Sequence, residues 1–187
     1  ARRPDARVRW LAAWIRDNMA PDGVWNSRRI VIFTEYEATR RWLEKRLEEE
    51  LDDLAPDERI ARYTGATPLD RREELKRRFN ADPAADPLRI LICTDAAREG
   101  INLQSRCHDL VHFDLPWNPA RLEQRNGRID RKLQPAPEVN CRYFVYEQRE
   151  EDIVLAALVE KTERIREQLG SAGQVIAARV EDRLSRE

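Results

Sequence analysis

The chain has 187 residues, enough for the hydrophobic core of one ordinary domain, and 41% of them are hydrophobic. Its 34 Lys and Arg residues nearly balance 35 Asp and Glu residues, which excludes nucleic-acid binding through overall positive charge. No apolar run reaches the roughly 18 residues of a membrane span, and the N-terminus lacks the apolar core of a signal peptide. Three widely spaced cysteines outside any CxxC pattern indicate reduced thiols, so we expect a cytoplasmic protein without membrane contact.

Strand and helix patterns alternate along the chain. Residues 5–19 carry apolar side chains at helical spacing, and a Pro-Asp-Gly turn follows them. Short apolar runs typical of buried strands occur at 29–34, 59–64, 89–94, 109–114 and 141–146. Helical patterns follow the strands, among them 69–79, a segment starting near 118, and 150–169. The alternation predicts an α/β fold in three layers, with a mainly parallel sheet flanked by helices, an N-terminal helix and a C-terminal helical extension.

The segment WNPARLEQRNGRIDR contains the first candidate functional residues. Its Asn-Pro pair suits the cap and first turn of a helix, which we expect to continue through the arginines. Gln124, Arg128 and Arg131 would then share one face, with Gly127 beside them. Two guanidiniums on one rigid element can fork around a transferring phosphoryl group, a role worth roughly 10³ to 10⁵ in rate. For the segment alone, a solvated charged helix explains the pattern as well.

A second candidate site follows the strand at 89–94, because ligands of parallel sheets bind at the carboxyl ends of the strands. In LICTDAAREGINLQ the strand ends at Thr94 and Asp95, and the following turn contains Gly100 and Asn102. A hydroxyl and free backbone amides at this place can hold a phosphate, and Asn102 can bond a ribose. A simple turn capped by Asp95 is the alternative for this segment.

Together these segments resemble the C-terminal RecA-like lobe of superfamily two helicases, nearest the Swi/Snf-type DNA translocases. Four stretches match family motifs in order and spacing: VIFTEY (31–36), YTGATPLDRREELKRRFN (63–80), TDAAREGINLQ (94–104) and QRNGRIDRKLQ (124–134). The likeness is greatest to the bacterial RNA-polymerase-associated branch and related phage-defence ATPases. It implies a P-loop NTPase-like lobe over residues 28–148, after a helical lead-in at 1–27 and before a C-terminal helix and tail at 149–187.

The resemblance also implies roles in nucleotide binding. Arg128 and Arg131 match the arginines that reach the ATP phosphates, and Gln124 matches the leading glutamine of the same motif. Gly100 and Asn102 match positions on the nucleotide side of the cleft. The segment departs from many relatives at residues 132–133, where Lys-Leu stands in place of a glycine-containing pair. The conformation after Arg131 is therefore left open.

Four further residues match positions that contact nucleic acid in such motors, namely Thr64, Gly65, Arg72 and Thr94. Hydroxyls and main-chain amides bind the backbone of the nucleic acid, which carries no sequence information. The resemblance therefore implies sequence-independent movement on nucleic acid, with duplex DNA as the expected substrate.

The sequence lacks the residues that anchor ATP in a first lobe. It has no GxxxxGK[ST] phosphate loop, and no apolar strand in it ends in an Asp-Glu pair. With its first residue an Ala and its motif set incomplete, we expect a segment of a longer polypeptide that supplies an N-terminal RecA-like lobe. ATP and Mg²⁺ would be held mainly by that lobe, and this segment alone would not hydrolyse ATP. The alternative is a non-enzymatic docking or regulatory module, with the tail from Ser171 as a protein contact.

Two other patterns do not lead to a site. Cys93 stands at a strand end, but Arg98 comes one residue too early for a phosphatase loop. His108 and His112 fall in or beside a predicted strand with no third ligand evident, so we expect structural histidines and no metal site.

Overall fold

The computed structural model describes residues 5–95, 102–131, 134–146, 148 and 150–169. These residues form two compact units, each considered by itself. The first unit comprises the described residues of 1–114 and 125–144, and the second those of 115–124 and 145–187.

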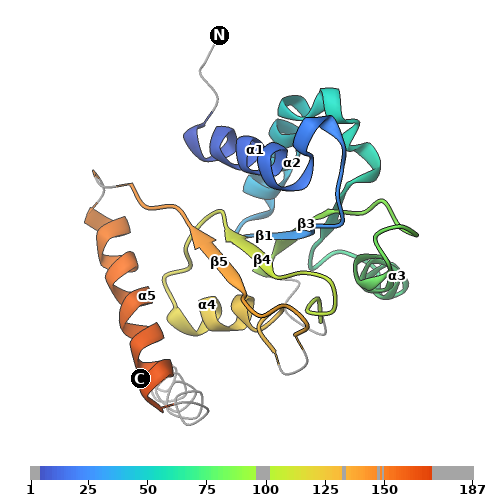
Figure 1. Ribbon diagram of the computed structural model, residues 1–187. Helices are drawn as coiled ribbons and strands as arrows, with labels where there is room; N and C mark the ends of the chain where they lie inside the picture. The colour runs from blue at the N-terminus through green and yellow to red at the C-terminus, as the bar shows by residue number, and fades with distance from the viewer. Residues whose placement is uncertain (1–4, 96–101, 132–133, 147, 149, 170–187) are drawn as a thin grey trace. The chain divides into compact units, whose positions relative to one another are not determined.

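The first unit is built on a five-stranded sheet in the order β2-β3-β1-β4-β5, in which every pair of neighbouring strands is parallel (Figure 1). Its strands are β1 (Ile30–Thr34), β2 (Ile60–Tyr63), β3 (Ile90–Thr94), β4 (Asp109–His112) and β5 (Asn140–Tyr143). Thr34 pairs with Thr94 and Phe33 with His112, so the carboxyl ends of the three central strands meet at one edge. The predicted parallel sheet is confirmed.

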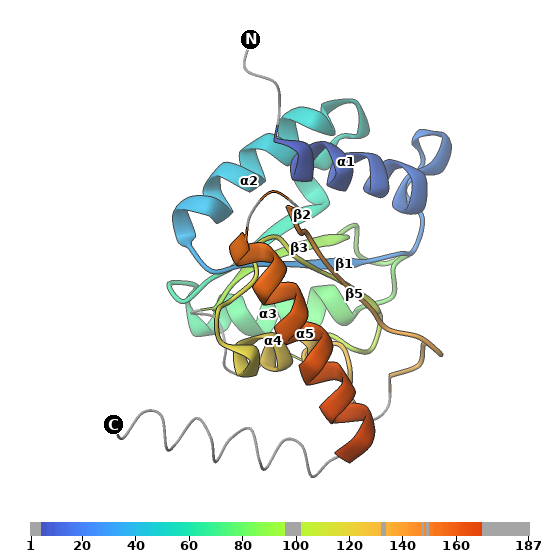
Figure 2. The same cartoon turned by 90° about the vertical axis from the view of Figure 1, so that its left-hand side faces the viewer.

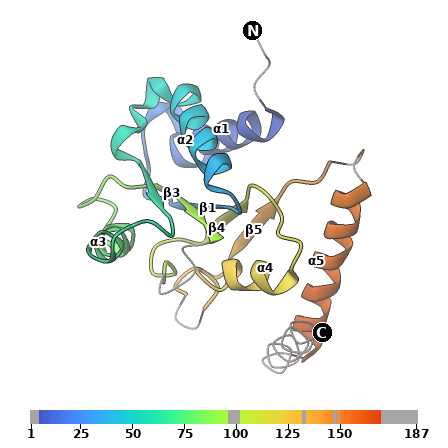
Figure 3. The same cartoon turned by 180° about the vertical axis from the view of Figure 1, so that it is seen from behind.

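Helices cover both faces of this sheet (Figures 1 and 2). α1 (Ala6–Met19) and α2 (Glu37–Glu50) lie on one face, and α3 (Leu69–Asn80) lies on the other, as the view from behind also shows (Figure 3). Short 3₁₀ turns lie in the connections from helix to strand: η1 (Pro21–Gly23) follows α1, and η2 (Asp52–Leu54) and η3 (Pro56–Glu58) follow α2.

Alternate strand residues supply two separate cores, because successive side chains of a strand point to opposite faces. Ile30 and Ile32 of β1 join the cluster that contains the apolar residues of α1 and α2. Val31 and Phe33 join the cluster that contains Leu75 and Phe79 of α3. Full burial of each such side chain contributes roughly 1.5–3 kcal/mol. All five residues of β1 are buried, and the hydroxyl of the last, Thr34, is hydrogen-bonded to Asp114.

α1 forms where the sequence predicts a helix. The side chain of Asp5 caps it by accepting a hydrogen bond from the backbone N–H of Arg7 (2.8 Å). Its apolar face packs in the same cluster as the sheet, so this helix belongs to the core of the first unit. The turn after it uses the left-handed region at Asp22 (φ 56°) and Gly23 (φ 77°).

The second unit contains most of α4 (Pro119–Asn126) and all of α5 (Glu150–Leu169). The Asn118 side chain accepts a hydrogen bond from the backbone N–H of Ala120 (2.9 Å), so the predicted cap is confirmed. The predicted helix over 150–169 is confirmed as α5. The tail after residue 169 lies outside the described residues. No described helix combines the length and the apolar character needed to cross a bilayer.

Candidate functional site

The predicted site region at the carboxyl edge of the sheet contains a buried polar network, which we call the Arg125 network: Asp95, His112, Asp114, Arg125 and Asn126. Four of its members, all except Asp114, are no more than 6% exposed. Buried polar groups are stable only when they are hydrogen-bonded, and every member has a partner inside the network.

Arg125 forms the centre of the network. Its Nε and Nη2 donate to the two carboxylate oxygens of Asp95, each at 2.7 Å, in a bidentate pair. Its Nη1 donates to the backbone carbonyl of Asp114 at 2.8 Å. The guanidinium also lies over the ring of Phe33, 5.6 Å from its centroid. Arg125 therefore joins the end of β3 to the segment that follows β4.

His112 is held neutral inside this network. Its Nε2 lies 2.8 Å from Oδ1 of Asn126, which can only accept, so Nε2 carries the proton and Nδ1 is the acceptor. Nη1 of Arg125 lies 3.4 Å from that Nδ1. Burial, and secondarily the positive charge of Arg125, lowers the pKa of His112 to about 3. The expectation that His112 is structural agrees with these contacts.

Asp114 connects the network to β1. One carboxylate oxygen accepts from the Thr34 hydroxyl (2.5 Å), and the other accepts from the backbone N–H of Glu35 (2.8 Å). The second oxygen also lies 3.4 Å from Nη2 of Arg125. The ends of β1, β3 and β4 are thus tied together by side chains.

Arg125 and Asp114 are not among the residues predicted from the sequence, and Asp95 is predicted there only as a turn cap. The carboxylate of Asp95 is instead committed to Arg125, which is 30 residues away in the chain. The available indication was that Asp95 directly follows one predicted buried strand and Asp114 ends another, where an unpaired carboxylate would be costly.

The predicted helix through Arg128 and Arg131 is wrong. α4 ends at Asn126, and residues 127–129 form a hydrogen-bonded turn in which the N–H of Arg128 bonds the carbonyl of Arg125 (3.0 Å). The helix stops here because Ile129 is drawn into the core and the carbonyl of Arg128 accepts from Leu103 N–H (3.0 Å). The two arginines therefore do not share a helical face with Gln124, which lies exposed on α4.

The two arginines nevertheless remain electrostatically coupled. Arg128 is half-buried, and its pKa is lowered by burial and then by the positive charge of Arg131. Arg131 is exposed, and its Nε donates to the carbonyl of Gly127 (2.6 Å). Gly127 therefore belongs to the turn after α4, and its carbonyl holds the side chain of Arg131.

The other nucleotide-side candidates are described only in part. Asn102 is exposed, and its backbone carbonyl accepts a hydrogen bond from the side chain of Asn80 at the end of α3 (2.8 Å). Gly100 lies outside the described residues.

Three of the candidate nucleic-acid residues, Thr64, Gly65 and Thr94, lie at the ends of β2 and β3, and Arg72 lies in the first turns of α3. Arg72 donates to the carbonyls of Thr67 and Gly65, each at 2.7 Å, so its guanidinium supports the loop after β2. The backbone N–H of Thr64 bonds the Thr67 hydroxyl (2.9 Å), while Gly65 is exposed. Thr94 is 3% exposed.

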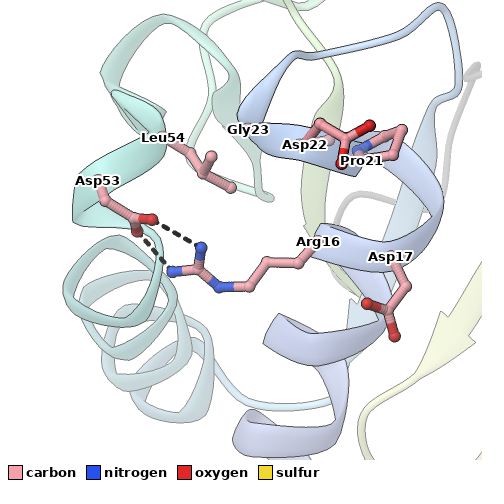
Figure 4. Close-up of a pocket in the computed structure, with 8 residues that line it drawn as sticks. Arg16, Asp17, Pro21, Asp22, Gly23, Asp53 and Leu54 are labelled. Carbon is pink, nitrogen blue, oxygen red and sulfur yellow. Dashed lines mark hydrogen bonds and ion pairs between the residues drawn. The ribbon is translucent and has the colours of Figure 1, made fainter.

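A shallow pocket of about 410 Å³ lies elsewhere in the first unit, between the end of α1 and η2 (Figure 4). Arg16 faces it, but its guanidinium is paired with Asp53 (2.5 and 2.8 Å) and bonds the Glu50 carbonyl (2.6 Å). None of the candidate residues lines this pocket.

The chain matches one known protein family over most of the sheet. The helicase conserved C-terminal domain matches residues 18–132, more than half of the chain. The chain belongs to this family. Its resemblance to superfamily two helicases, predicted from the four motifs, is thereby confirmed.

The helicase C-terminal domain has relatives among much longer proteins. It is 32% identical over 148 residues to an uncharacterized ATP-dependent helicase, YqhH of Bacillus subtilis, covering 79% of this chain and 24% of the relative. It is 32% identical over 127 residues to the RNA polymerase-associated protein RapA of Yersinia enterocolitica, covering 68% of this chain and 12% of RapA. The chain thus spans a quarter or less of these relatives.

The fold is also found in a solved structure. The crystal structure of the C-terminal part of the Fun30 ATPase domain aligns with a TM-score of 0.64 at 21% identity. The alignment covers 83% of this chain and 46% of that one. The predicted RecA-like lobe is confirmed.

Proposed function

We propose that this helicase C-terminal domain is the second motor lobe of an ATP-dependent nucleic-acid translocase, in which Arg128 and Arg131 act on the phosphates of ATP. The observation that carries the proposal is the placement of the half-buried Arg128 just after α4, where its backbone carbonyl accepts from Leu103 N–H (3.0 Å), with the exposed Arg131 three residues further on. Burial, and secondarily the positive charge of Arg131, lowers the pKa of Arg128, so an anion bound nearby would favour its charged form.

The size of this effect is sufficient for catalysis. A guanidinium and a phosphate charge about 4 Å apart attract by about 4 kcal/mol at an effective dielectric constant of about 20. Stabilisation of that size, applied to charge that develops in the transition state, matches the roughly 10³ to 10⁵ contributed by an arginine finger.

The nucleotide itself would be held mainly by a first lobe of the same polypeptide. That lobe supplies the phosphate-loop lysine and the carboxylates for Mg²⁺, which this sequence lacks. Gln124, Gly100 and Asn102 would complete the nucleotide side from this lobe. The isolated segment would therefore hydrolyse no ATP.

Duplex DNA is the proposed track. The exposed backbone at Gly65, held in place by Arg72 and Thr67, suits contact with a phosphate backbone. Arg72 would act through the loop, because its guanidinium is already committed to two carbonyls. Thr94 would contact DNA only after its surroundings open, since it is buried here.

The test uses the full-length parent protein and its nucleic-acid-stimulated ATP turnover. We expect Arg128→Ala and Arg131→Ala each to lower kcat by roughly 10³-fold or more, with little change in nucleic-acid affinity. Arg77→Ala, on an exposed position of α3, is the matched control and should retain normal turnover. Normal turnover in the Arg128 or Arg131 variant would reject the proposed role. A strand-displacement assay then separates translocation from unwinding.

A further inference from the structure

Arg125 lies in the same short segment as Arg128 and Arg131, yet its surroundings are entirely different. A guanidinium has five N–H groups, and here every one has an acceptor. The Asp95 carboxylate takes two of them, the Asp114 carbonyl one, and the weaker 3.4 Å contacts to His112 and the Asp114 carboxylate the remaining two. Arg125 therefore has no donor left for a nucleotide.

The backbone beside this fixed side chain builds the turn that carries the other two arginines. The carbonyl of Arg125 accepts from the N–H of Arg128 (3.0 Å). The carbonyl of Asn126 accepts from the N–H groups of Ile129 (3.1 Å) and Asp130 (2.9 Å). The side chain of Asn126 is bound to His112, so both residues that begin the turn are anchored to the sheet by their side chains.

We propose that Arg125 is a positioning residue. Its side chain fixes the start of the turn after α4 to the ends of β3 and β4, and this sets the positions of Arg128 and Arg131. The proposal rests on the proposed function, because it assumes that Arg128 and Arg131 act on nucleotide. Arg125 stabilises no charge in the reaction itself. It keeps the turn from shifting when the nucleotide binds.

The geometry of the pair between Arg125 and Asp95 requires an arginine at position 125. A bidentate pair with Asp95 and simultaneous bonds to Asp114 need the planar fork of an arginine. A lysine keeps the positive charge beside Asp95 but offers three donors from a single nitrogen. Arg125→Lys therefore preserves the charge and loses the fixed geometry.

The experiment compares variants of the full-length parent protein. Arg125→Lys is expected to lower nucleic-acid-stimulated kcat by roughly 10²-fold, the loss that follows a misplacement of about 1 Å. KM for ATP and Kd for nucleic acid should stay within about threefold, because Arg125 touches neither ligand. Binding of ADP with aluminium fluoride, a mimic of the transferring phosphoryl group, should weaken by a similar 10²-fold while ADP binding is retained.

A second variant and a control distinguish a loss of positioning from a loss of folded protein. Asp95→Asn with Arg125→Gln removes both charges, so neither is left buried and unpaired, and it should show the same loss of kcat. Arg29→Lys is the matched control. That arginine is fully buried, bonds the carbonyls of Leu88 (3.0 Å) and Ala81 (2.6 Å), and lies at the opposite end of β1. It should lower the melting temperature without lowering kcat of the folded enzyme.

The outcomes are separable. Wild-type kcat in Arg125→Lys, with kcat abolished in Arg128→Ala, overturns the positioning role and leaves the proposed function intact. Wild-type kcat in Arg128→Ala overturns the proposed function. A loss of kcat in Arg125→Lys that equals its loss of folded protein, or that also appears in Arg29→Lys, reduces Arg125 to a structural residue.

Discussion

Protonation of His112 should make the fold sensitive to mild acid. The pKa of this buried imidazole is lowered from 6.5 to about 3 in the folded chain, whereas the unfolded chain has the ordinary value. Between these two values the unfolded state binds the extra proton and the folded state does not. Stability therefore rises with pH across this window and falls as the pH is lowered from about 6.5.

The magnitude follows from the two pKa values. At pH 5 the unfolded state gains about 2 kcal/mol from protonation of this histidine, and at pH 7 it gains about 0.2 kcal/mol. His112 should therefore lower the free energy of unfolding by about 2 kcal/mol between pH 7 and pH 5. That amount is a large fraction of the total stability of an ordinary domain.

Urea unfolding at the two pH values measures this difference, with His112→Gln as the reference. The glutamine variant lacks the titrating ring, while every other titratable residue, including His108, remains. The wild-type chain should lose about 2 kcal/mol more than the variant on going from pH 7 to pH 5. An equal pH dependence in the two proteins would refute the assignment of a buried neutral imidazole.

Two further predictions concern the turn after α1 and the cysteines. Gly23→Ala should lower the free energy of unfolding by about 1 kcal/mol through backbone strain alone, since φ is +77° and an added Cβ meets no atom within 4 Å. Chemical denaturation measures this difference. An unchanged stability would contradict the left-handed conformation of Gly23. Burial raises the pKa of the Cys93 thiol, and it raises that of Cys107 to about 12. A thiol reagent at pH 8 should therefore modify the half-buried Cys141 first, and rapid labelling of Cys93 in folded protein would contradict its placement.

Much of the fold follows from local patterns in the sequence. The run at 29–34 predicted β1, because a short run of β-branched and apolar residues is typical of a strand buried on both faces. The apolar spacing over 5–19 predicted α1, and the Asn118-Pro119 pair predicted the start of α4. Each of these signals is contained within a few residues, so no knowledge of distant contacts is needed.

The end of α4 could not be predicted in the same way. Spacing in NGRIDR is compatible with a continuing helix, and only one glycine argues against it at a cost of about 1 kcal/mol. The competing conformation buries Ile129, binds Asn126 to His112 and pairs the Arg128 carbonyl with Leu103. Those contacts join residues distant in sequence, and together they exceed the local preference.

The sequence by itself determined the family, the parallel α/β class and the candidate residues Arg128 and Arg131, because these depend on motifs and periodicity. Tertiary structure alone decided that Arg125 is buried against Asp95 and that Arg128 and Arg131 lie beyond the end of α4. A polar residue carries no local sign of whether water or a distant carboxylate will satisfy its hydrogen bonds. Only the meeting of β3, β4 and the end of α4 makes that choice, since it removes Arg125 from water and leaves Asp95 as its charge partner.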